Sequence, residues 1–330
     1  MRTFHKWIDV FYQTAFTALS LYLIFLLLRY PALSLEYAST GLILWFEKMI
    51  PTLLPFMILS GIMIRMNLTG KFVSFLHPFL HRIYGTSPNG SYTIVMGFLC
   101  GFPMGARIIG ELYHAGRLSR EESTGLLSFC NNIGPIYFLS FVVPALSVRR
   151  PLLPFCIMYG IPLLYGIVIM RILPSIRRHL RKRAPQNALP YCEPVSSCKM
   201  QAAHSDAAMP LLSAVDNSVV SGLSGIARLG GYMVFFNLLN IAFTPFHNVS
   251  PVFLCLSNCL LEITSGIDRG SHLLFYSILT LLPFGGFSCI AQTYSMIQHT
   301  DLSIRPYLLH KVIQTLITAV CYLLCSRVLF

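Results

Sequence analysis

One apolar segment, GFLCGFPMGARIIGEL, holds an arginine and a glutamate behind a run of interrupting glycines and a proline. Gly101, Pro103 and Gly105 weaken the helical hydrogen-bond ladder, so backbone N–H and carbonyl groups become available to a ligand. Arg107 follows this break, and a cation beside free N–H groups suits an anionic or carboxylate-bearing substrate. The alternative is a structural ion pair between Arg107 and Glu111, which share one helix face, and both roles can hold in different states.

A second candidate for the substrate site, FCNNIGPIY, places two asparagines directly before a Gly-Pro pair. Asn131 and Asn132 lie within an apolar segment, where unpaired amides are costly, and Gly134 with Pro135 frees backbone carbonyls for ligation. We interpret this segment as part of the substrate site. The alternative is a polar contact between helices in which the asparagines only cap the break.

A matching polar set lies in the second half of the chain. Glu262 ends an apolar run and could bind a coupling proton or cation, or it could face water at the membrane interface, because Asp268 and Arg269 follow it. The predicted substrate-binding residues are Gly101, Phe102, Pro103, Gly105, Arg107, Asn131, Asn132, Gly134, Glu262, Gly285, Gly286, Phe287, Ser288 and Gln292.

The elements that must position these residues are membrane helices. The chain has 330 residues, of which 55% are hydrophobic and only 11% are charged, whereas soluble domains carry about 25% charged residues. We therefore expect an all-α, polytopic membrane protein of about 8–10 transmembrane helices. A shorter segment near 71–84 indicates a re-entrant or interfacial helix. The apolar segments lie near 11–29, 40–64, 91–111, 122–147, 151–174, 226–246, 250–266, 271–297 and 307–329.

The chain divides into four predicted parts. These are an N-terminal transmembrane helix at 1–39, a first repeat with a linking helix at 40–174, a basic polar linker at 175–212 and a second repeat at 213–330. The net charge of +12 does not indicate a nucleic-acid partner, because the densest basic cluster, at 177–183, directly follows an apolar segment. There it is typical of a cytoplasmic anchor that contacts anionic lipid.

The two repeats align weakly. An offset of 184 residues places GFPMG at 101–105 on GGFSC at 285–289, and it places Arg107 on Ala291. If the basic cluster is cytoplasmic and the segment near 71–84 crosses the membrane, the repeats are inverted; without that crossing the downstream orientation reverses. Inverted repeats with broken helices are typical of secondary transporters, which bind substrate near the bilayer midplane between the repeats.

Enzyme signatures are absent from the sequence. It contains no HExxH, GxSxG, P-loop or GxGxxG motif, and its ten cysteines show no paired spacing for a metal. We therefore expect a protein that is not an enzyme and that has no catalytic residues, metal or cofactor.

Several motifs, in chain order, carry a resemblance to a known family. They are PTLLPF at 51–56, GFPMGAR at 101–107, FCNNIGP at 129–135, GGY at 230–232, LEITSG at 261–266 and FGGFS at 284–288. The chain resembles the YlbJ family of sporulation integral membrane proteins, also called stage V sporulation protein V. The resemblance implies a nucleoside-recognition, or Gate, domain, which concentrative nucleoside transporters share. It also implies a role in endospore formation, in which dipicolinic acid moves across the outer forespore membrane.

These observations lead to one main hypothesis and two alternatives. The first is a multi-pass secondary transporter of a small anionic metabolite, with dipicolinate as the leading substrate, to which Arg107 and the rings of Phe102 and Phe287 are chemically suited. The alternatives are a nucleoside-type transporter and a non-transporting membrane scaffold for spore cortex assembly, in which the basic linker would act. The sequence leaves open the coupling ion, a proton or sodium, and the oligomeric state, a homo-oligomer included.

Overall fold

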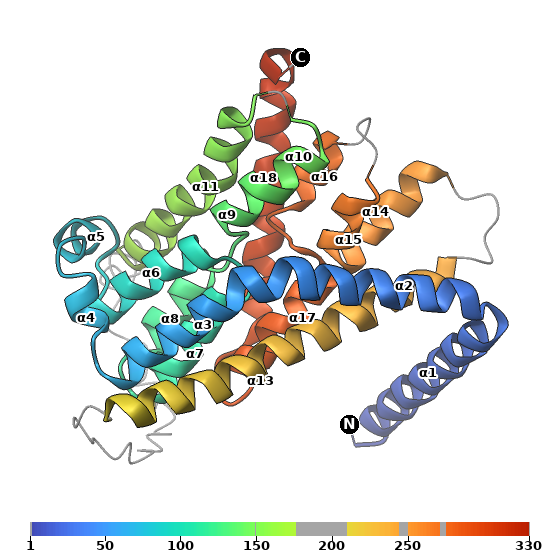
Figure 1. Ribbon diagram of the computed structural model, residues 1–330, viewed down its shortest axis with the longest axis horizontal. Helices are drawn as coiled ribbons and strands as arrows, with labels where there is room; N and C mark the ends of the chain where they lie inside the picture. The colour runs from blue at the N-terminus through green and yellow to red at the C-terminus, as the bar shows by residue number, and fades with distance from the viewer. Residues whose placement is uncertain (1, 149, 176–209, 244–249, 271–274, 330) are drawn as a thin grey trace, which may run out of the picture.

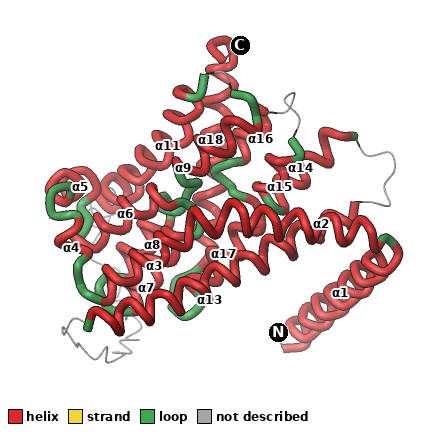
Figure 2. Tube along the Cα trace, viewed as in Figure 1, coloured by secondary structure: helices red, strands yellow, loops and turns green. Residues whose placement is uncertain are grey.

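The computed structural model describes residues 2–148, 150–175, 210–243, 250–270 and 275–329, and within these ranges it contains helices and no strand (Figure 2). Four helices there are long and apolar enough to cross a membrane on their own, and they are Pro31–Arg65, Leu152–Ser175, Leu211–Phe243 and Ile304–Cys325. The prediction of an all-α, polytopic membrane protein is confirmed. The basic cluster at 177–183, and with it most of the predicted linker, lies outside the described residues.

Two long helical rods lie side by side and form one face of the molecule (Figure 1). The first rod consists of α2 (Pro31–Leu44), the π-helical turn η1 (Trp45–Met49) and α3 (Ile50–Arg65). The second consists of α13 (Leu211–Leu238) and the turn η4 (Leu239–Phe243). Glycines allow the rods to approach closely: the Trp45 ring packs on Gly230, and its Nε1 donates to the Ile226 carbonyl at 2.8 Å. Helix α1 (Arg2–Arg29) diverges from these rods.

Four of the predicted apolar segments are divided into shorter helices, and the breaks expected at 101–105 and 131–135 are present; the segment near 250–266 is divided at Glu262. The segment near 91–111 forms α6 (Pro88–Cys100) and α7 (Met104–His114), and the segment near 271–297 forms α16 (Phe275–Leu281) and α17 (Gly286–Ile297). The segment near 122–147 forms α8 (Arg120–Leu127) and then α9 (Pro135–Tyr137), which continues through η2 (Phe138–Val142) into α10 (Val143–Ala145). Glycine and proline follow the ends of α6 and α16 and interrupt the hydrogen-bond ladder there, whereas α8 ends at Leu127, before Gly134 and Pro135.

Serine side chains cap the N-termini of several of these helices. Ser250 caps α14 (Pro251–Leu261) and accepts a hydrogen bond from the Phe253 amide, as Ser87 does for α6 and Ser119 for α8. Helix α15 (Ile263–Asp268) follows α14 after a single residue. The segment near 71–84, predicted to be short, forms α4 (Thr69–Phe72) and α5 (His77–Tyr84).

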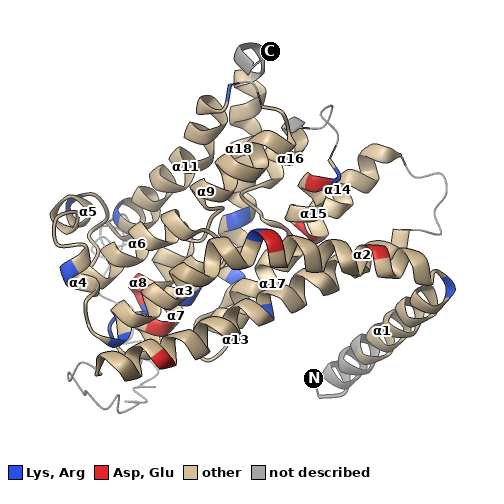
Figure 3. Cartoon of the chain, viewed as in Figure 1, with Lys and Arg blue, Asp and Glu red and all other residues tan. Residues whose placement is uncertain are grey.

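The remaining described helices complete the bundle. Helix α11 (Leu152–Ile167) continues into the π-helical turn η3 (Val168–Ile172), and α18 (Ile304–Leu329) passes through the interior toward the C-terminus (Figure 1). Charged side chains are sparse over the helices (Figure 3), as a lipid-facing surface requires. Both halves follow the order of a broken pair, a loop and a further helix, as α6–α7–α8 and α16–α17–α18. Whether the two halves are inverted in the membrane stays a prediction.

Candidate functional site

The two broken segments of the first half cross each other. We call this the first crossing; it comprises residues 101–103 and 128–134. A Cβ atom on Gly101 would lie 2.4 Å from the Gly134 nitrogen, and one on Gly105 would lie 2.3 Å from the Cys130 carbonyl oxygen. The backbone of Gly101 has φ 86° and ψ −171°, a conformation that only glycine adopts readily. These glycines are therefore required by the contact between two backbones, and the peptide bond before Pro103 is cis.

The side chain of Asn131 forms hydrogen bonds between the first crossing and the second half of the chain. Its Nδ2 donates to Thr293 Oγ1 of α17 at 2.8 Å and to the Tyr307 hydroxyl of α18 at 3.1 Å. Its Oδ1 accepts the Ala106 amide at 3.4 Å, in the first turn of α7. The amide thus makes the polar contact between helices that was the alternative to a direct substrate role.

Asn132 binds a lysine that the sequence analysis did not single out. The Lys311 ammonium of α18 donates to Asn132 Oδ1 at 2.7 Å and lies 3.5 Å from Gln314 Oε1. Gln314 in turn donates to the Ser128 carbonyl at 2.7 Å. The side chain of Lys311 is 0% exposed, so its amino group lies buried beside the unwound backbone of the first crossing.

A second crossing joins the α14–α15 junction at Glu262 to residues 282–286. A Cβ atom on Gly286 would lie 3.0 Å from the Cys259 carbonyl oxygen, so the backbones of two segments are in close contact here as well. Glu262 is 1% exposed, and its carboxylate accepts the Thr264 amide at 3.2 Å and the Ser265 amide at 2.8 Å. Glu262 is therefore the N-cap of α15, and the interpretation that it faces water at the interface is wrong.

A small cavity lies between the two crossings. Its walls include Phe102, Gly134 and Tyr137 from the first half and Glu262, Thr264 and Gln292 from the second. Helices α3 and α13 close a further side through apolar residues such as Phe56 and Leu229. The cavity volume of about 50 Å³ holds water molecules but is far below the roughly 300–1,000 Å³ of sites that hold small organic ligands. The cavity as it stands is therefore too small for such a ligand.

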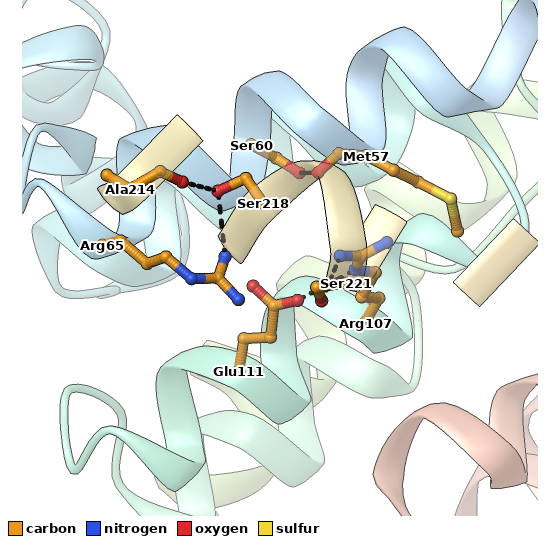
Figure 4. Close-up of polar contacts among 8 residues, drawn as sticks. All are labelled: Met57, Ser60, Arg65, Arg107, Glu111, Ala214, Ser218 and Ser221. Carbon is orange, nitrogen blue, oxygen red and sulfur yellow. Dashed lines mark hydrogen bonds and ion pairs between the residues drawn. The ribbon is translucent and has the colours of Figure 1, made fainter. Parts of the chain in front are cut away.

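Arg107 lies outside the cavity wall, at the contact between α7 and α13 (Figure 4). It is 4% exposed, its Nε donates to Glu111 Oε1 at 2.9 Å, and its Nη2 donates to Ser221 Oγ at 2.9 Å. In Figure 4 the guanidinium of Arg65 donates to Ser218 Oγ, also on α13, at 3.1 Å. The structural ion pair with Glu111 is thus present. The Nη1 atom of Arg107 has no hydrogen-bond partner among the described residues, which leaves it a donor for an anion or water.

The other predicted residues of the second half divide between the interior and the surface. Gln292 donates from Nε2 to Ser288 Oγ at 2.9 Å, and both side chains are buried. Phe287 is 47% exposed and packs edge to face on Phe284, so its ring points away from the cavity. Gly285, with φ 75°, lies against the ring of Phe102. Phe102 therefore belongs to both crossings.

Sequence reasoning missed Lys311 although a signal existed. A lysine within a predicted transmembrane segment indicates a functional position, but Lys311 stands near the start of the segment 307–329. There a long basic side chain ordinarily extends to the membrane surface. Only the position of α18 against the first crossing shows that this side chain points inward.

Comparison with known proteins agrees with this architecture. Residues 46–149, which contain the whole first crossing, match a family model described as Gate, nucleoside recognition. That part of the chain is therefore similar to a Gate domain. It is also 26% identical to the sporulation integral membrane protein YlbJ of Bacillus subtilis (strain 168), over 94% of this chain and 82% of that protein. The resemblance inferred from the motifs is confirmed, and no solved structure matches the chain.

The Gate match covers only part of the candidate site. The matched residues include Gly101, Arg107 and both asparagines, whereas Glu262, Gln292 and Lys311 lie beyond residue 149. The cavity nevertheless needs both halves, because each contributes one crossing. Chemically, the arrangement offers a carboxylate, an amide and a hydroxyl on the cavity wall, with a buried ammonium behind it.

Proposed function

We propose that this protein is a secondary membrane transporter that moves a small anionic metabolite, dipicolinate, during endospore formation. The relative that spans nearly the whole chain is named for sporulation and for its integral membrane location. Transport would take place in the cell membrane, at the outer forespore membrane. A coupling proton or sodium ion, anionic lipid at the linker 175–212 and a homo-oligomeric state remain part of this proposal.

The observation that carries the proposal is the pair of crossings around one small cavity. Unwound backbone inside a membrane leaves N–H and carbonyl groups without helical partners, and this is tolerated where it lines a cavity or is buried in protein. A simple anchor has no use for Glu262, Asn132 and Lys311 in its interior, because each is costly to bury. Discontinuous helices that meet between two halves of a chain support a transporter.

The charge of the site favours an anion. Lys311 lies behind the cavity wall, and Arg107, at the contact between α7 and α13, offers a further N–H that has no partner among the described residues. The small volume of the cavity means that the halves must separate before a dicarboxylate enters, as alternating access between inverted repeats requires.

A nucleoside is the second candidate substrate, and the Gate match supports it. Glu262 and Gln292 on the cavity wall could hydrogen-bond an uncharged sugar or base without any help from the cations. The two candidates differ in net charge, which makes them separable in one assay.

The test is counterflow into proteoliposomes that contain the purified protein, with radiolabelled dipicolinate and uridine compared side by side. We expect saturable dipicolinate exchange, reduced at least about tenfold by Arg107→Ala. Arg305→Ala removes an exposed arginine and is the matched control, expected to exchange at the wild-type rate. Exchange of uridine alone would replace the substrate with a nucleoside, and exchange of neither would refute transport of both.

A further inference from the structure

Lys311 is the buried charge for which the described residues supply no counter-charge. Its ammonium is held by the amide oxygens of Asn132 and Gln314, and the ring centroids of Phe102 and Tyr307 lie 5.0 and 5.7 Å from Nζ. Within the described part of the chain no carboxylate lies within 4.0 Å of it. Amide dipoles and ring faces stabilise an ammonium but leave its charge in place.

Arg107 differs from Lys311 in this respect. It forms an ion pair with Glu111 at 2.9 Å, so its positive charge is already compensated before any substrate arrives. An isolated charge in a low-dielectric interior is expensive, and an anion that reaches Lys311 would remove that cost. The uncompensated ammonium is therefore the stronger attraction for a carboxylate.

Phe102 connects Lys311 to the cavity. Its ring forms part of the cavity wall and also faces the ammonium, while Lys311 itself is not among the lining residues. On another side the ring lies against Gly285 of the second crossing, where only a hydrogen atom stands in place of a side chain. A displacement of Phe102 would both enlarge the small cavity and bring the ammonium to its surface.

We propose that Lys311 binds a carboxylate of the transported anion and that the ring of Phe102 covers its ammonium until the substrate replaces it. The class of ligand follows from what Phe102 supplies, because a ligand with a planar aromatic ring can take the place of the Phe102 ring beside the ammonium. A carboxylate on that ligand adds the missing negative charge. This inference rests on the proposed function and deepens it, because it assigns the recognition of charge to Lys311 in the second half of the chain.

The test compares two probes of the same shape that differ in charge, dipicolinate and the neutral pyridine-2,6-dicarboxamide. Their affinities for the purified, detergent-solubilised full chain are measured by calorimetry at fixed salt. We expect the wild type to bind the dianion at least about tenfold more tightly, and Lys311→Met to lose this preference. Lys311→Arg keeps the charge and should keep the preference, while Lys71→Met makes the same change at an exposed lysine and should behave as the wild type.

Each result has a distinct meaning. A charge preference that survives in folded Lys311→Met overturns the role of Lys311 and leaves the proposed transport of an anion intact. A wild type that binds neither probe refutes the proposed function and this inference with it. If Lys311→Met does not give a cooperative thermal transition, Lys311→Gln replaces it, because an amide can still donate a hydrogen bond to Asn132 Oδ1.

Discussion

The first and second crossings are built alike in their backbone but carry opposite charges. In each, a glycine of one broken helix approaches the backbone of another break, Gly101 at Gly134 and Gly286 at Cys259. The first crossing holds the ammonium of Lys311, whereas the second contains the carboxylate of Glu262. Glu262 lines the cavity directly, whereas Lys311 lies behind the ring of Phe102.

The two halves of the chain therefore share the breaks but not the charges. The offset of 184 residues pairs the break at Gly101 with that at Gly285, but it pairs Lys311 with Leu127 and Arg107 with Ala291. Backbone geometry can be duplicated because it depends on small residues. A charged side chain that binds substrate is needed in only one half of the chain.

The largest expected difference between the crossings is in the effect of alanine on stability, at Gly101 in the first and Gly285 in the second. Gly101→Ala places a Cβ atom on the Gly134 backbone and forces a conformation outside the reach of L-residues, each at about 1–3 kcal/mol. Gly285→Ala keeps a left-handed conformation at about 1–2 kcal/mol and meets side-chain atoms at 3.1 Å that are able to shift. We expect loss of folded protein in the first variant and a lowered melting temperature in the second.

Size-exclusion chromatography and thermal melting in detergent provide the measurement. Gly160→Ala is the matched control, because nothing lies within 4 Å of a Cβ atom at Gly160. Equal stability of Gly101→Ala and Gly285→Ala would contradict the closer backbone contact at Gly101.

Substitution of Glu262 should have the next largest effect, and it tests the negative side of the comparison. Glu262→Ala leaves two buried amides of α15 without an acceptor, at about 0.5–2 kcal/mol for the lost cap. Glu262→Gln keeps one acceptor oxygen and removes the charge. We expect a clear drop in melting temperature for alanine and a smaller one for glutamine.

Counterflow then shows whether the Glu262 carboxylate acts only as the cap of α15 or also through its charge. If its carboxylate only caps α15, Glu262→Gln should exchange dipicolinate at nearly the wild-type rate. A rate reduced severalfold in stable Glu262→Gln would instead assign the charge a part in coupling or substrate binding.

The smallest effect concerns the two phenylalanines that the sequence analysis treated alike. Phe102→Leu removes the ring that lines the cavity and faces Lys311, so dipicolinate exchange should fall severalfold with little loss of stability. Phe287→Leu changes a ring that is 47% exposed and points away, so exchange should stay within about twofold of wild type. Similar losses in both variants would contradict the placement of the site between the crossings.

The sequence by itself determined the class of the protein and the positions of its breaks. An apolar composition excludes a soluble domain, and the Gly, Pro and Asn clusters at 101–105, 131–135 and 285–286 can end a helix whatever surrounds them. These are local or averaged properties, so neighbouring residues are enough to reveal them. The motifs likewise indicated the Gate domain and the likeness to YlbJ.

Only the tertiary structure decided which of these residues meet. It brought Phe102, Gly134, Glu262 and Gln292 to one cavity, turned Phe287 outward and joined Arg107 to Glu111 beside α13. It also carried Lys311 to Asn132, which is 179 residues away in the chain. The direction of a side chain on a membrane helix depends on which helix packs against it. Contacts between distant segments establish that packing, and no local pattern records it.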